Sequence, residues 1–211
     1  MSSTYTINLG LRKPLNRDPE TLESWDQVIN NNMDLIDAAS LIQNRSVILF
    51  PEFPGASLTL SGSNNVGELT SDVDDATYRF NHYKWLSSSV TLQSYDISVQ
   101  WQVPVTFLNW QADALQIDIC TQLADITNCK VDATICKDGV LVTTSAKVDK
   151  ISTVGTTWYS ARGSNALIVF TSADGVISSL VAEDILNIKI RMYSKSSNYV
   201  KIGNITLNYK G

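Results

Sequence analysis

Histidine is the rarest residue type in this chain among those that commonly serve in catalysis. Its count limits the reactions that the protein can catalyse. His82 is the single histidine among 211 residues. A Ser-His-Asp triad, a two-histidine metal site or a facial triad would need this residue, which lies in a strand-like stretch without a G-x-S-x-G turn. The phosphate-loop pattern G-x-x-x-x-G-K is also absent. The sequence therefore predicts a protein that is not an enzyme and holds no cofactor.

The densest group of acids is a second candidate for chemistry. Glu68 is followed by Asp72, Asp74 and Asp75. Hard cations such as Ca²⁺ take several carboxylate and carbonyl oxygens from one loop. The spacing lacks the glycine and the terminal glutamate of an EF-hand, so a solvated acidic loop is favoured and a calcium site is the alternative.

Two loop-like stretches place tryptophan beside polar residues, at 109–111 (Asn-Trp-Gln) and at 157–159 (Thr-Trp-Tyr). An aromatic ring can stack on the apolar face of a sugar while its polar neighbours bind the hydroxyl groups. Trp110, Trp158 and Tyr159 are therefore candidate glycan contacts. The alternative for these aromatic residues is structural packing in a core.

The three cysteines, Cys120, Cys129 and Cys136, show no C-x-x-C pairing. An odd count without metal-ligand spacing is typical of reduced thiols in a protein made in a cytosol. Cys129 and Cys136 are the nearest plausible pair, but along one strand they would lie ~23 Å apart at about 3.3 Å per residue. We expect no disulfide and no metal site.

Composition and charge narrow the range of partners. The chain has 16 Lys and Arg against 21 Asp and Glu, a net charge of −5, and 44% hydrophobic residues. A pI near 4.8 disfavours a nucleic-acid partner, because binding to phosphates depends on clustered Lys and Arg. The sequence has no apolar run of 18 residues and no signal-peptide pattern at its start, so neither a membrane partner nor secretion by that route is expected.

From residue 76 onward, apolar and polar residues alternate with the period of two that is typical of half-buried strands. Asp138-Gly139 separates two such runs and predicts a tight hairpin. In 199–209 the alternation changes phase across Gly203, as a β-bulge requires. Eight or nine strands without helical periods between them predict a mainly β domain at 76–211, an antiparallel β-sandwich of jelly-roll or Greek-key type.

The residues before this domain divide into two parts. Residues 1–17 carry a charge of +3 and residues 18–45 carry −5, which marks 1–45 as a separate segment. Asp18-Pro19 predicts the start of one amphipathic helix, because Asp caps the first turn and Pro fits its first position. Residues 46–75 contain turn residues and are expected to be a connector with at most a short strand at each end.

The expected helix carries a heptad seam, because Leu22, Trp25, Ile29 and Ile36 recur at the required spacing with Asn32 at the one polar place. A seam of this kind buries its apolar face against copies of itself. A flanking stripe widens that face, which favours a homotrimer over a dimer: Val28, Leu35 and Ile42. The alternative is a helix that packs on its own domain.

The N-terminal residues resemble the attachment segment of tailed-bacteriophage virion proteins. Residues 8–14 read N-L-G-L-R-K-P, and residues 25–37 match W-x-x-x-x-N-x-N-x-D-x-I-D. In that family the segment occurs on fibres, spikes and related surface proteins, and the β domain after it varies. The resemblance implies a structural protein that is made in the host cytoplasm, lies on the virion surface and contacts other virion proteins. The implied anchor residues are Asn8, Leu9, Leu11, Lys13 and Pro14.

Three functions fit these observations. The leading hypothesis is a trimeric head or tail fibre that docks through its N-terminus and displays the β-sandwich for host attachment. One alternative is a capsid decoration (cement) protein that stabilises capsomers. Another is a carbohydrate-binding module that contacts a host surface glycan. A depolymerase is disfavoured, because the 76–211 domain offers no convincing pair of catalytic acids.

The predicted heptad seam can be tested through the oligomeric state of the chain. Each buried aliphatic side chain contributes roughly 1.5–3 kcal/mol, and Ile29→Asp with Ile36→Asp would also bring like charges together. We expect this double variant to shift the oligomer towards monomer while the β domain keeps its circular dichroism spectrum. Light scattering of the wild-type chain at micromolar concentration gives the reference mass. A wild-type mass of one chain would refute the seam, and a mass of two would refute only the trimer.

Overall fold

The chain divides into two compact units, Met1–Asn44 with Gly211, and Arg45–Lys210. A computed structural model describes these parts of the chain: 4–5, 12–13, 31–34, 36, 42–53, 55–60, 66–74, 80–138, 140–161 and 165–211.

In the first unit, β1 (Thr4–Tyr5) pairs antiparallel with β2 (Arg12–Lys13). Residues 31–34 and 36 are helical, and the side chain of Ile36 is 45% exposed in the single chain. The other apolar seam residues and most of the anchor residues lie outside the described residues, so the seam and the anchor stay predictions: Leu22, Trp25, Ile29, Asn8, Leu9, Leu11 and Pro14.

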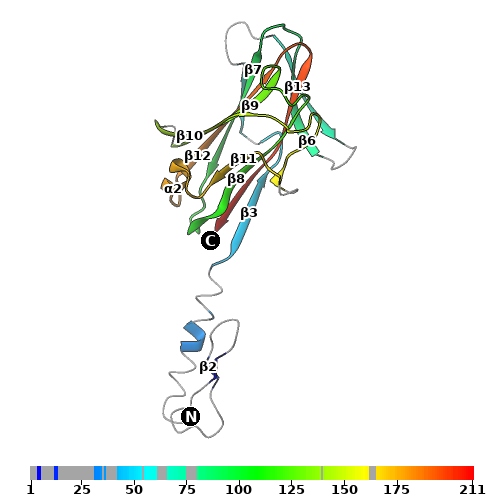
Figure 1. The fold of residues 1–211 in the computed structure, drawn as a ribbon. Coiled ribbons are helices and arrows are strands. Elements are labelled where there is room, and N and C mark those ends of the chain that lie inside the picture. Colours follow the sequence, from blue (N-terminus) through cyan, green and yellow to red (C-terminus); the bar gives the residue numbers. More distant parts are fainter. Residues whose placement is uncertain are drawn as a thin grey trace, which may run out of the picture. The chain divides into compact units, whose positions relative to one another are not determined.

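In its described residues, the second unit has two packed sheets and one short α-helix, α2 (Gly175–Ser179) (Figure 1). The five-stranded sheet has the order β10 (Val140–Lys150), β9 (Cys129–Lys137), β12 (Ile185–Ser194), β7 (Gln93–Gln102) and β4 (Ser57–Leu60). The six-stranded sheet has the order β11 (Ile168–Thr171), β8 (Asn109–Thr121), β13 (Asn198–Lys210), β6 (Phe80–Ser87) and β5 (Glu68–Asp74), with β3 (Asn44–Leu49) also paired to β13.

Both sheets are antiparallel along these orders, which confirms the predicted mainly β, sandwich-like architecture. No helix in the described part of the chain is long and apolar enough to cross a bilayer.

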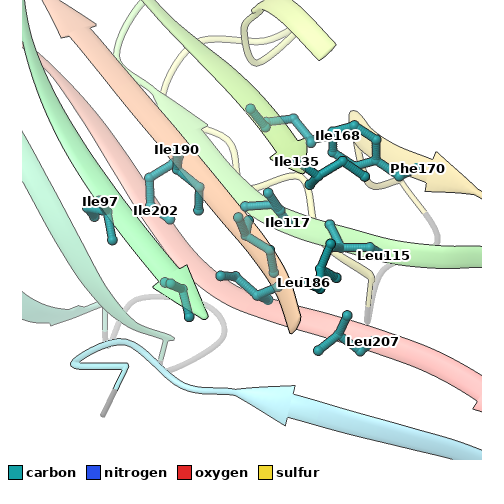
Figure 2. Close-up of a cluster of buried hydrophobic side chains, with 14 of the residues drawn as sticks. Ile97, Leu115, Ile117, Ile135, Ile168, Phe170, Leu186, Ile190, Ile202 and Leu207 are labelled. Carbon is teal, nitrogen blue, oxygen red and sulfur yellow. The ribbon is translucent and has the colours of Figure 1, made fainter. Parts of the chain in front are cut away.

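The core forms because each central strand points alternate apolar side chains at the facing sheet. Ile190 of β12 lies directly opposite Ile97 of β7 and Ala133 of β9, and all three are fully buried. Figure 2 shows Ile97 and Ile190 of one sheet and Ile117 and Ile202 of the other in the same cluster. Burial of such side chains contributes about 25 cal/mol per Å² of apolar surface, which is the main force that holds the two sheets together.

Two local predictions are confirmed. β9 and β10 form a hairpin in which Val140 pairs with Lys137, and Asp138 takes the positive φ of 47° that the turn requires. In β13, the register against β8 shifts between Ile202 and Ile205, so Gly203 lies in a β-bulge.

The prediction that residues 46–75 form a connector with at most a short strand at each end is wrong. This stretch contributes most of β3 and all of β4 and β5, which pair with β13, β7 and β6. Pro51 and Phe53, in the turn after β3, are buried, and Phe53 belongs to the core. The sandwich therefore begins at Arg45 rather than at residue 76. These strands lie at sheet edges and bury few side chains, so their sequence shows little alternation.

None of the three cysteines forms a disulfide in this structure. Cys129 and Cys136 both lie in β9, where Cys129 is fully buried and Cys136 is half-buried. Burial raises the pKa of the Cys129 thiol, which donates a hydrogen bond to the Leu123 carbonyl at 3.3 Å. Raising a thiol pKa lowers the thiolate fraction and hence its reactivity.

The outer face of the five-stranded sheet carries a buried acid. Asp96 of β7 lies directly opposite Arg191 of β12, and its side chain is only 6% exposed. Arg191 donates from Nε and Nη2 at 2.6 and 2.8 Å, and the Lys189 Nζ lies 2.8 Å away. Burial acts to raise the pKa of Asp96, but the hydrogen bonds and charges of Arg191 and Lys189 outweigh it and lower the pKa below its ordinary value.

Asp96→Asn is expected to lower the free energy of unfolding at pH 7 by about 1.5–3 kcal/mol, because Arg191 and Lys189 lose a charged acceptor. The pKa of Asp96 is lower in the folded than in the unfolded chain, so its contribution is complete above about pH 3.9 and is lost as the pH falls through the folded-state pKa. Wild-type protein should therefore lose stability on acidification more steeply than Asp96→Asn. Urea unfolding at pH 7 and below pH 4, followed by circular dichroism, measures both effects.

Asp149→Asn is the control for this prediction. Asp149 pairs with Lys130 at 2.6 Å, but its side chain is 48% exposed. An exposed pair contributes under about 1 kcal/mol. Equal losses of stability in the two variants would contradict the special role of Asp96.

Candidate functional site

The three candidate glycan contacts do not come together in the fold. Trp110 lies at the start of β8, whereas Tyr159 forms an isolated bridge with Ile119 near the other end of that strand. Nine positions of an extended strand span ~30 Å at about 3.3 Å per residue. Trp110 therefore cannot contact the same sugar ring as Tyr159.

Trp110 is a packing residue. The prediction of a loop at 109–111 is wrong, because these residues open β8, and the Trp110 side chain is 8% exposed. Its ring packs 5.1 Å from Phe107, 5.9 Å from Trp101 and 6.4 Å from Tyr209 between ring centroids. The edge of this aromatic cluster lines a cavity of about 600 Å³. With 8% of its side chain exposed, Trp110 serves mainly in the packing of this cluster.

The acidic cluster is not a loop. Glu68, Asp72 and Asp74 lie in strand β5, with Asp72 directly opposite His82 of β6, and Asp75 lies outside the described residues. The described residues contain no group of three or more His, Cys, Asp or Glu side chains that could hold a metal ion.

Residues 151–161 form a platform that is fastened to β8. Tyr159 and Ile119 exchange both backbone hydrogen bonds, at 2.9 and 3.0 Å. Ser152 and Thr121 each accept from the other's backbone N–H through the side-chain oxygen, at 2.9 Å in both cases. The Ala161 N–H donates to Asp118 Oδ1 at 3.0 Å. Because three residues along this segment, Ser152, Tyr159 and Ala161, are held, the side chains that it carries are positioned before any ligand arrives.

Trp158 and Tyr159 point to opposite sides of this platform. Tyr159 lies opposite the core residue Ile119 and packs on the core, with its hydroxyl bonded to that of Thr153. Trp158 lies over the outer face of the six-stranded sheet, against Gly203. A Cβ atom at Gly203 would lie 3.2 Å from Cζ3 of the Trp158 ring. Of the two candidates, only Trp158 is thus placed on the outer face.

The neighbours of Trp158 are residues that no sequence pattern singles out. His82 of β6 contacts the ring edge-on, with 5.6 Å between ring centroids. The Lys201 Nζ lies 6.0 Å from the Trp158 ring centroid and 5.4 Å from that of Tyr199. The Lys84 Nζ lies 5.3 Å from the Tyr199 centroid. Two half-buried aromatic rings and two ammonium groups therefore lie side by side on one sheet face, within cation–π range.

Strand register explains this grouping. Lys201 of β13 lies directly opposite Lys84 of β6 on one side and Cys120 of β8 on the other. Lys84 in turn lies opposite Thr70 of β5. Alternation around Val200 and Ile202 could have shown that Tyr199 and Lys201 face outward, but no sequence signal pairs them with Lys84.

A polar hollow of about 300 Å³ adjoins His82. Its lining includes the carboxylates of Glu52 and Asp72 and the amide of Asn81. These groups can accept from and donate to hydroxyl groups. His82 lines the hollow and also contacts Trp158, so one side chain connects the Trp158 ring with the hollow. The outer face of the six-stranded sheet thus offers ring faces for stacking next to groups for hydrogen bonding, which are the two requirements of a saccharide site.

Gly203→Ala tests the contact under Trp158. Its Cβ would lie 3.0 Å from the Asp118 Cβ and 3.2 Å from the Trp158 ring, so the ring must move. We expect a loss of about 1–3 kcal/mol of stability, as for other overpacked sites, and a shifted indole N–H signal of Trp158 in NMR spectra. Combining the change with Trp158→Phe should recover part of the loss. An unchanged indole signal would show that the ring does not rest on Gly203.

Comparisons with known proteins give distant likenesses only. No protein-family model and no curated protein matches the chain. The chain is similar to a family 11 carbohydrate-binding module from Clostridium thermocellum in complex with a mixed-linked tetrasaccharide (TM-score 0.42, 10% identity, 78% of this chain and 94% of that one). It is also similar to TmCBM61 in complex with β-1,4-galactotriose (TM-score 0.42, 9% identity, 75% and 89%). A third likeness is to the enzymatically active domain of bacteriophage CBA120 tailspike protein 4 (TM-score 0.44, 13% identity, 74% of this chain), of which this chain spans 20%.

Proposed function

We propose that this chain is a non-enzymatic, glycan-binding surface protein of a tailed-phage virion. Residues 1–45 attach it to other virion proteins, and the β-sandwich contacts a saccharide on the host surface. The saccharide lies on the outer face of the six-stranded sheet, over Trp158 and beside the hollow at His82.

The observation that carries the proposal is the position of the Trp158 ring. It rests on Gly203, where no side chain intervenes, and its segment is fastened to β8 by backbone hydrogen bonds. A sugar that stacks on this ring needs no rearrangement of the platform, so little binding energy is lost in ordering it. Hydroxyl groups at the ring edge would reach the carboxylates and the amide of the hollow.

Attachment to the virion rests on the N-terminal resemblance and on the charge reversal at 1–45. The sandwich, residues 45–210, is a compact unit of its own. Display of an independent sandwich at the end of an attachment segment suits a protein that docks at one end and binds at the other.

A second candidate function, capsid decoration, is favoured by the cavity next to Trp110. Its lining includes Leu108 and Val181, whose side chains are 54% and 58% exposed. Exposed apolar side chains around a concave surface are typical of protein contacts. This second function would be favoured if the chain bound no glycan and if its binding to purified capsids were unchanged by the loss of Trp158.

Trp158→Ala tests the glycan proposal. We expect it to weaken binding of the full chain to host lipopolysaccharide and capsule preparations at least tenfold, because the stacking surface is removed. Trp158→Phe should keep part of the affinity. Biolayer interferometry measures both, and circular dichroism shows whether the variants fold.

The matched control is Tyr193→Ala. Tyr193 is a half-buried ring on the outer face of the other sheet, and it also has a lysine, Lys130, at 4.9 Å. Its loss should leave glycan binding unchanged. If Tyr193→Ala abolishes binding and Trp158→Ala does not, the site is on the five-stranded sheet and the proposal is wrong.

A further inference from the structure

We infer that the sugar unit in the hollow beside His82 is not acidic: its hydroxyl groups donate to the carboxylates of Glu52 and Asp72, which repel an acidic group in the same place. This inference rests on the proposed function and adds the chemical class of the ligand.

The hollow offers acceptors and negative charge to a ligand. Glu52 and Asp72 line it, both residues are exposed, and none of its described lining residues is a lysine or an arginine. An ionised carboxylate has no hydrogen to donate, so it binds only groups that donate one. One Asp72 oxygen accepts from the Val73 N–H at 2.8 Å, and further acceptor positions of this carboxylate remain for a ligand. Sugar hydroxyl groups can donate to them, whereas an ionised acid cannot.

The turn after β3 fixes the backbone of Glu52 at the edge of the hollow. Across this turn the Phe53 N–H donates to the Phe50 carbonyl at 3.1 Å, and Pro51 and Phe53, on either side of Glu52, are buried. The Phe53 ring lies 6.0 Å from that of Tyr83 in β6, between centroids. Burial, and after it the negative charge of Glu52, raises the pKa of the Tyr83 hydroxyl. The core thus sets the place of this charge, and a ligand meets it without rearranging the turn.

The lysines of the same sheet face do not reverse its charge. Lys84 of β6 lies directly opposite Lys201 of β13. On β5, Glu68 and Asp72 are the diagonal neighbours of Lys84, one on each side. On β8, Asp118 is a diagonal neighbour of Lys201. Diagonal neighbours on one face lie ~7–8 Å apart, within the screening length of about 8 Å at physiological ionic strength, so these acids offset the two ammonium groups.

Acids lie on both sides of a sugar that stacks on Trp158. Next to the ring, the Asp118 Oδ1 accepts from the Ala161 N–H at 3.0 Å, and the Asp118 Cβ would lie 3.0 Å from a Cβ at Gly203, on which the ring rests. The hollow on the other side of His82 adds its own carboxylates. An acidic sugar unit would therefore be repelled here, and a neutral one is favoured.

The response to salt distinguishes this mechanism from attraction by the lysines. Added salt screens attraction and repulsion alike. Binding of an acidic saccharide through ammonium groups would weaken as salt is added. Binding of a neutral sugar through hydrogen bonds should stay unchanged, because no charge of the ligand is screened.

The test measures binding of the full chain to host capsule and lipopolysaccharide preparations, before and after their carboxyl groups are reduced to alcohols with carbodiimide and borohydride. We expect binding to be retained or strengthened by the reduction, because the site takes hydroxyl groups and repels carboxylates. Biolayer interferometry at rising salt concentration should show no fall in affinity.

Asp72→Asn changes the charge of the hollow while keeping the shape of the side chain. We expect it to weaken binding roughly fivefold, because a charged acceptor is replaced by a neutral one. Glu52→Gln should act in the same direction. Asp149→Asn is the matched control, because it removes an exposed acid of the other sheet, and it should leave binding unchanged. Circular dichroism shows whether the variants fold.

The outcomes separate the two proposals. Weaker binding after carboxyl reduction, or an affinity that falls with salt, overturns the inference of a non-acidic ligand and leaves the glycan proposal standing, which Trp158→Ala tests. Equal effects of Asp72→Asn and Asp149→Asn also overturn the inference, because the hollow would then have no role of its own. Binding to no host preparation overturns both.

Discussion

The β-bulge at Gly203 in β13 is the constraint on which both the core and the candidate site depend. Before it, Val200 and Ile202 face the core, and after it Ile205 and Leu207 do. A strand without the extra residue would turn one of these pairs to solvent, because the side-chain period of a strand is two. The same extra residue leaves a bare glycine on the outer face, which is where the ring of Trp158 lies. Core packing and a flat aromatic surface thus come from one local irregularity.

The two outer faces of the sandwich differ in how their charged side chains are arranged. On the five-stranded sheet, Asp96 is enclosed by Arg191 and Lys189, and Asp149 compensates Lys130, so the charges are paired within the protein. On the six-stranded sheet, Lys84 and Lys201 lie opposite each other beside aromatic rings. A paired network of opposite charges holds a sheet together, whereas two lysines directly opposite each other repel.

The platform at 151–161 shows how a loop can act as part of a rigid site. Its bridge to Ile119 extends the edge of the sheet by one residue pair, and Ser152 and Thr121 satisfy each other's backbone N–H groups. A loop held in this way keeps its side chains in place at little entropic cost on binding. The buried Asp118, which accepts from Ala161, adds a further fixed point next to Trp158.

Features that depend on local period and local turn chemistry could be predicted from the sequence. Alternation indicated the strands that bury one face, Asp138-Gly139 indicated the hairpin, and the change of phase indicated the bulge at Gly203. It did not show β3, β4 and β5, because edge strands bury few side chains and turn residues dominate that stretch. It also could not separate Trp110 from Trp158, since both are tryptophans among polar neighbours and only their packing differs. The lysine pair was decided by tertiary structure alone: Lys84 and Lys201 are more than a hundred residues apart, and only the pairing of β6 with β13 makes them neighbours.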